Sequence, residues 1–186
     1  MRVLGIDDSP FQFGDKRALV VGVVMRLPSY LEGVMRTECQ VDGTDANVVL
    51  DRMIMRSRYR DQLRLVMIDG VALGGFNVVD ISLLNRRTGI PFVTVTRDPP
   101  DMLAMKEALR DHFDDWESRM SVIMKNPLRE VPTDHKPIYV SEVGIDPEMT
   151  DELIRGCTVR GALPEPIRIA HLIATAMVMG ESRGRA

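Results

Sequence analysis

Two short runs of apolar residues in this chain lack polar alternation, and each run ends at an aspartate. The first run is Val3–Asp7 and the second is Leu65–Asp69. Continuous apolar runs of this length are typical of strands that are buried on both faces, as in a parallel sheet. The repeated pattern therefore predicts two buried strands that each present a carboxylate where the strand ends.

The rest of the hydrophobic pattern predicts a chain in which three strands precede an alternation of helices and strands. We predict strands at Arg2–Asp7, Ala18–Arg26, Val34–Val41, Arg64–Asp69, Pro91–Thr96 and Ile138–Val143. We predict helices at Asp45–Tyr59, Asn77–Arg87, Asp101–Lys125 with a break near His112–Asp114, Pro147–Arg155 and Pro166–Met179. Gly89 and Pro127 follow two of these helices, as residues that end a helix commonly do.

The order of these elements restricts the topology of the sheet. Short connections make the first three strands an antiparallel meander, and a helical crossover makes the fourth strand parallel to a neighbour. If the fourth strand lies beside the first, Asp7 and Asp69 meet at the sheet edge where ligands bind in open α/β folds. The prediction is an α/β, ribonuclease H-like mixed sheet flanked by helices, with strands 4 and 5 parallel. A length of 186 residues fits one such domain over residues 1–186, with a frayed tail at about 180–186.

Two carboxylates at one edge predict a site for a hard divalent cation. Asp7 and Asp69 would offer the oxygen ligands that Mg²⁺ or Mn²⁺ prefers, and such sites support phosphodiester hydrolysis. The alternative for either residue alone is a turn, because Asp after a strand starts Asx turns and Asp69-Gly70 is itself a turn dipeptide. Taken together in this topology, the two residues favour the shared metal site. Asp8 should point to the opposite face of an extended strand.

The last predicted helix adds a third candidate ligand. It is apolar almost all round, which is typical of a buried helix, except for Arg168, His171 and Thr175 at helical spacing. Polar groups on a packed face need partners, and the carboxylate pair would supply them. We therefore predict that His171 is catalytic and that Arg168 contacts phosphate, with a satisfied structural histidine as the alternative for His171.

Two further residues fall near the same edge. Arg97 ends the fifth strand, where it would neutralise charge that develops on a phosphate during cleavage; otherwise it would pair with Asp98 or Asp101. Asp45, on the helix after the third strand, is a tentative third metal ligand. Its alternative role is to complement the positive end of the helix dipole.

Composition narrows the class of protein more than its function. The net charge of −3 is mildly unfavourable for nucleic-acid binding, although arginines cluster between residues 52 and 64 and acidic residues between 98 and 117. Two distant cysteines indicate reduced thiols in a cytoplasmic protein. We expect neither a signal peptide nor a membrane span, and therefore no membrane partner. The common nucleotide-binding loop, zinc-protease and serine-hydrolase motifs are missing from the sequence.

Several motifs together resemble the endonuclease dU family, which is related to endonuclease V. They are Gly5–Phe11, Asp42–Asp45, Ile68–Gly70, Gly89–Val93 and Leu163–His171. The resemblance covers nearly the whole chain and implies a ribonuclease H-like fold and metal-dependent cleavage of nucleic acid near a deaminated base. It implies deoxyuridine as the lesion, with deoxyinosine as the second candidate, and DNA rather than RNA as the favoured partner.

The resemblance also assigns residues by position. Asp7 and Asp69 match the metal-binding aspartates of endonuclease V, His171 matches the last catalytic position of that superfamily, and Arg97 stands where endonuclease V has a lysine. Asp45 lies near the place of a glutamate on the first helix. One motif differs, because the Pro-Tyr-Ile-Pro loop with which endonuclease V wedges the duplex open is replaced by Asp42–Asp45. The resemblance therefore leaves the recognised base open.

The leading hypothesis is a Mg²⁺- or Mn²⁺-dependent endonuclease of the DNA-repair type. One rival is a non-catalytic nucleic-acid-binding or adaptor module on the same scaffold, because a fold does not determine a function. A second rival is a phosphatase or nucleotide hydrolase that uses the same metal chemistry on a small substrate. The sequence leaves the oligomeric state open.

Overall fold

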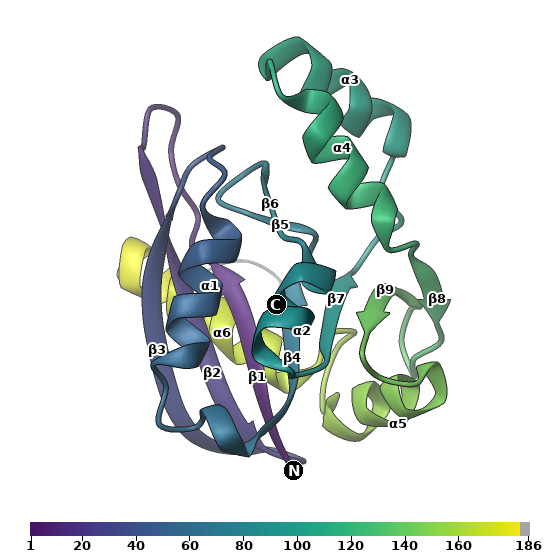
Figure 1. Ribbon diagram of the computed structural model, residues 1–186. Coiled ribbons are helices and arrows are strands. Elements are labelled where there is room, and N and C mark those ends of the chain that lie inside the picture. The colour runs from purple at the N-terminus through teal and green to yellow at the C-terminus, as the bar shows by residue number, and fades with distance from the viewer. Residues whose placement is uncertain (183–186) are drawn as a thin grey trace.

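A seven-stranded mixed sheet forms the centre of the molecule (Figure 1). The computed structural model describes residues 1–182. In spatial order the strands are β3 (Tyr30–Gln40), β2 (Arg17–Arg26), β1 (Arg2–Asp8), β4 (Leu63–Asp69), β7 (Phe92–Thr96), β9 (Ile138–Val143) and β8 (Arg129–Val131).

The pairing of the strands confirms the predicted topology. Strands β1, β2 and β3 form an antiparallel meander, while β4 lies parallel to β1 and β7 lies parallel to β4. Strand β9 closes the other side antiparallel to β7, and the short strand β8, which the sequence pattern did not predict, pairs with β9. The two apolar runs that end in aspartate are thus neighbours at the centre of the sheet.

Helices cover both faces of the sheet, and this explains why its central strands are apolar on both sides. Helices α1 (Ala46–Met55) and α2 (Ile81–Thr88) pack on one face, and α6 (Glu165–Met179) packs on the other against β1 and β2 (Figure 1). Helix α5 (Pro147–Cys157) adds Ile154 and Cys157 to a core that includes Leu65 and Met67 of β4. Leu4 and Ile6 of β1 belong to the core on the α1 and α2 face.

Two predicted helices begin or end at other residues. The segment predicted as helix from Asn77 starts with a small hairpin, β5 (Ala72–Leu73) and β6 (Asn77–Val78), and the helix begins only after Asp80. The Asp80 side chain accepts a hydrogen bond from the Leu83 amide and so caps α2. The helix predicted to reach Tyr59 ends at Met55 and is followed by a short 3₁₀ helix, η1 (Arg60–Gln62).

The predicted break near His112–Asp114 is confirmed. It separates α3 (Met102–His112) from α4 (Trp116–Lys125), and the two form a hairpin that extends beyond the sheet (Figure 1). Buried Arg119 fastens the hairpin, because it donates to the carbonyls of Gly43 and Phe76 at 2.9 and 2.7 Å.

The remaining boundaries agree closely with expectation, although β3 starts earlier than predicted, at Tyr30. Most of the tail predicted to fray, residues 183–186, lies outside the described residues. Within residues 1–182, no helix has the length and apolar character needed to span a membrane.

Candidate metal centre

The register of β1 and β4 places Asp7 and Asp69 side by side on one face of the sheet. Ile6 pairs with Ile68, so the next residue of each strand is an aspartate. Side chains alternate between the faces of a strand, and Leu65 and Met67 belong to the core on the α5 and α6 side. Both aspartates therefore project toward α6, as the repeated strand pattern predicted.

A glycine in β1 lets α6 approach the strand closely. A Cβ atom at Gly5 would lie 2.6 Å from Cβ of Pro166, and closer still to that residue's carbonyl group. Only a residue without a side chain allows this contact, which places the first turn of α6 directly on β1. One turn further along, Nδ1 of His171 lies 2.9 Å from Oδ2 of Asp7.

Asp7, Asp69 and His171 form one group of potential metal ligands. Each offers one donor atom, and these atoms all lie within 4.8 Å of one another. Oxygen ligands bind Mg²⁺ or Ca²⁺ at roughly 2.0–2.6 Å, so two donors on one ion are separated by at most about 5 Å. The spacing is therefore compatible with one shared divalent ion. Asp7 is 5% exposed, and its Oδ1 accepts a hydrogen bond from the Asp8 amide.

The electrostatics of the group favour a cation between the carboxylates. Burial, together with the nearby Asp7 charge, raises the pKa of Asp69 to about 7. The hydrogen bond to Asp7 raises the pKa of His171 above its usual value, against the opposing effect of burial. Without a cation, the site thus holds protons at a pH where free carboxylates are ionised, and a divalent ion would replace them.

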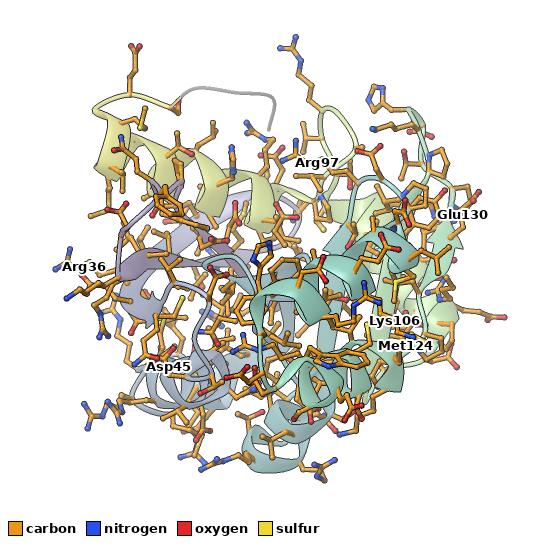
Figure 2. All side chains as sticks on the ribbon, turned by 90° about the horizontal axis from the view of Figure 1, so that it is seen from above. Arg36, Asp45, Arg97, Lys106, Met124 and Glu130 are labelled. Carbon is orange, nitrogen blue, oxygen red and sulfur yellow. The ribbon has the colours of Figure 1, made fainter. Side chains whose placement is uncertain are left out.

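Arg97 lies at the same edge. Its guanidinium Nη2 is 4.0 Å from Oδ2 of Asp69, a carboxylate that the sequence analysis did not name as its partner. Figure 2 looks down on this edge and shows Arg97 toward α6 and Asp45 beside α1.

Arg168 lies one turn before His171 on α6 and has a partner that the sequence analysis missed. Its Nε and Nη2 atoms each lie 2.7 Å from an oxygen of Glu165, in a two-pronged ion pair. Glu165 is almost completely buried, so it holds the guanidinium in place. The spacing of three residues within one helix could have revealed the pair from the sequence.

The structure does not bring Asp45 into the metal-ligand group. Its Oδ1 accepts hydrogen bonds from the Gln40 amide and from Nδ2 of Asn77 at 3.0 and 2.7 Å, on the α1 side of the sheet. These bonds join the β3–α1 turn to β6. Asp8 points away from Asp7, as predicted, and its carboxylate accepts a hydrogen bond from the Gly74 amide.

A cavity of about 580 Å³ adjoins the metal-ligand group. Gly70, which follows Asp69, and Thr96, which precedes Arg97, form part of its wall. The α3–α4 hairpin covers it with Met105 and Ile123, and the rest of the lining is also mostly apolar. The cavity is therefore suited to an apolar or weakly polar group.

The chain is similar to known proteins along its whole length. It is 43% identical to a UPF0215 protein of Methanosarcina barkeri over all of this chain and 95% of that one. A crystal structure of a protein of unknown function from Archaeoglobus fulgidus, 37% identical, superposes with a TM-score of 0.84 and covers 95% of this chain and 97% of that one.

A more distant similarity concerns the fold. Endonuclease V of Ciona intestinalis, in complex with a DNA that contains an inosine followed by a ribo-adenosine, superposes with a TM-score of 0.63 at 15% identity. The superposition covers 96% of this chain and 86% of that one, so the fold is the ribonuclease H-like one of endonuclease V. The sequence model of the family described as endonuclease dU matches residues 1–178. The chain therefore belongs to the endonuclease dU family.

Proposed function

We propose that this protein is a Mg²⁺- or Mn²⁺-dependent endonuclease of the DNA-repair type, which cleaves nucleic acid at or near a deaminated base. The observation that carries the proposal is the group of Asp7, Asp69 and His171, whose donor atoms lie within 4.8 Å of one another at the carboxyl edge of the sheet. Membership of the endonuclease dU family supports a nuclease. The DNA in the related endonuclease V complex supports DNA as the partner.

The three donors, two hard carboxylates and one softer imidazole, suit a divalent ion. Two carboxylates and one imidazole are ligands that Mn²⁺ accepts, and Mg²⁺ needs fewer protein ligands because it retains several waters. When bound, such an ion lowers the pKa of a water and stabilises negative charge on the phosphate.

The side chains around the ligands have separate tasks in this proposal. Asp7 holds the imidazole of His171 at Nδ1. The second ring nitrogen of His171 would then have one of two tasks, either to complete the metal ligands or to orient the attacking water. Arg97 would place positive charge beside Asp69, where charge develops on the phosphate. Arg168, fixed by Glu165, would contact a neighbouring phosphate through the part of its guanidinium that faces solvent.

The adjoining cavity supports recognition of a single base. Its volume of about 580 Å³ is ample for a nucleobase, and its mostly apolar wall would favour a base taken out of the stack. A uracil in DNA forms a weaker or mismatched pair after cytosine deamination, which lowers the cost of extrusion.

Both cysteines, Cys39 and Cys157, are free and buried, in keeping with a cytoplasmic protein.

The test compares cleavage of matched oligonucleotides with a single deoxyuridine, deoxyinosine or unmodified base, in Mg²⁺, Mn²⁺ or chelator. We expect metal-dependent cleavage near the deoxyuridine, abolished in Asp7→Asn and retained in Asp61→Asn, a matched change at a side chain that is 95% exposed. Full cleavage by purified Asp7→Asn would refute the proposal. Titration calorimetry with Mn²⁺ adds a second readout, since Asp69→Asn should remove the binding heat. Hydrolysis of free nucleotides without cleavage of oligonucleotides would assign the site to a small substrate instead.

A further inference from the structure

The loop between β1 and β2 begins at the metal-ligand group. Ser9 follows Asp7 and Asp8 directly, and it is tied to β2 by two hydrogen bonds with Leu19. The loop then extends from the carboxyl edge of the sheet to Lys16 and stands at the end of the molecule where the α3–α4 hairpin also projects (Figure 1). Whatever binds at the metal-ligand group therefore lies close to this loop.

The tip of the loop presents a phenylalanine to solvent. Phe13 is the most exposed of the large hydrophobic side chains described, at 109%. Its conformation is held by a turn, in which the Asp15 amide donates to the Gln12 carbonyl at 3.0 Å and the Gln12 amide donates to the Asp15 carboxylate at 2.7 Å. Gly14 supplies the positive φ of 95° that the turn requires. The turn thus fixes an aromatic ring away from the core, where it forgoes about 1.5–3 kcal/mol of burial energy.

A second phenylalanine connects the tip to the cavity. Phe11 is 39% exposed, and its Cζ atom lies 3.5 Å from the point that a Cβ at Gly75 would occupy. Gly75 also lines the cavity that adjoins Gly70. Phe11 therefore lies beside the cavity wall, and Phe13 follows it two residues later at the tip of the same loop.

The basic residues that follow Phe11 and Phe13 in the loop suit a polyanionic ligand. Lys16 is exposed at the base of the loop, and Arg17 follows it with an exposed ion pair to Glu38 at 3.1 Å. Exposed pairs of this kind contribute little to stability, so Arg17 can exchange its partner for a phosphate. Aromatic rings with nearby cations are the usual means by which proteins hold unpaired nucleotides.

We propose that Phe13 stacks on an unpaired nucleobase next to the scissile phosphate, with Phe11 between it and the cavity. The substrate class is then a nucleic acid with at least one unstacked base beside the cleaved position, either single-stranded or locally opened. This inference rests on the proposed function for the place of the scissile phosphate, while the stacking itself is measurable without cleavage.

The test measures binding in chelator by fluorescence anisotropy, with short single strands that contain one deoxyuridine. Loss of a stacked base costs about 1–3 kcal/mol, so Phe13→Ala should weaken binding by about 5- to 150-fold. Phe13→Trp should retain the affinity. Tyr30→Ala, which removes a 59% exposed ring at the opposite end of the sheet, should leave it unchanged.

A series of strands with one abasic position makes the test specific. With the native protein, affinity should fall at one position near the deoxyuridine, and this dependence should vanish in Phe13→Ala. Equal binding by native protein and Phe13→Ala would overturn the proposal, even if the native protein cleaves. A positional dependence without any cleavage would support the stacking role and refute only the proposed function. A different result would be that Phe13→Ala abolishes self-association of the protein and leaves the binding of all strands unchanged. That result would assign the Phe13 ring to a contact between protein molecules and would overturn the proposal.

Discussion

Gly5→Ala should disrupt the metal centre without altering any ligand. The new methyl group would lie 2.6 Å from Cβ of Pro166 and nearer to its carbonyl atoms, whereas carbon atoms in contact are about 3.5–4.0 Å apart. Either β1 or the first turn of α6 must therefore move by about 1 Å or more. Overpacking of this kind costs about 1–3 kcal/mol of unfolding free energy. The same displacement would separate His171 from Asp7, which now lie 2.9 Å apart, and misplacement by about 1 Å can cost about 100-fold in rate.

Urea denaturation, Mn²⁺ calorimetry and oligonucleotide cleavage would each report one part of this prediction. The matched control is Gly156→Ala in α5, where an added Cβ meets nothing within 4 Å. Because alanine is the better helix former, that control should be neutral or up to about 1 kcal/mol more stable. We expect Gly5→Ala to lose stability, Mn²⁺ affinity and cleavage together. If Gly5→Ala matched the native protein in all three, the argument that Gly5 sets the distance between α6 and β1 would be refuted.

Two further predictions concern pH and Asp45. The pKa of Asp69 is raised to about 7 and that of His171 is raised above its usual value, so in both cases the folded state holds the proton more tightly. The free energy of unfolding in chelator should therefore fall as the pH rises from about 4 to 8. Asp69→Asn should flatten this trend, as urea midpoints measured across that range would show. An unchanged slope in the variant would contradict the prediction. Asp45→Ala should lose about 1–3 kcal/mol, because the Gln40 amide and Asn77 lose their acceptor, with Mn²⁺ affinity unchanged in calorimetry. A weaker Mn²⁺ affinity in Asp45→Ala would instead place Asp45 in the metal centre.

The sequence could predict the central strands and their aspartates because both depend on local pattern. A strand buried on both faces leaves an uninterrupted apolar run, and alternation then fixes which face the next residue occupies. The topology needed only the lengths of the connections and the handedness of crossovers. The sequence could also predict His171 as a candidate, because a polar stripe on an otherwise apolar helix requires partners on the facing strands.

The positions that the sequence pattern missed depend on contacts between distant segments. The two-residue strands β5 and β6 are too short to show a period, so their hairpin was predicted as part of a helix. Without that hairpin, the sequence pattern does not reveal Asn77 as the partner of Asp45, for which it offered a metal ligand or a group that complements the helix dipole. Glu165 was missed although its spacing of three residues to Arg168 is visible, because the sequence pattern does not show that this glutamate is buried beside the arginine.

Separate parts of the fold converge on the candidate metal centre. The β1–β4 register brings Asp7 beside Asp69, and the absence of a side chain at Gly5 brings α6 close enough for His171 to reach Asp7. Asp7 is buried and Asp69 is partly buried, and this desolvation, together with the Asp7 charge, raises the pKa of Asp69 to about 7 although Arg97 lies 4.0 Å away. A fold that is held together mainly by apolar packing gains nothing from such a pair. The arrangement is favourable once a divalent cation lies between the ligands, and this is the strongest physical argument that the site functions with a metal.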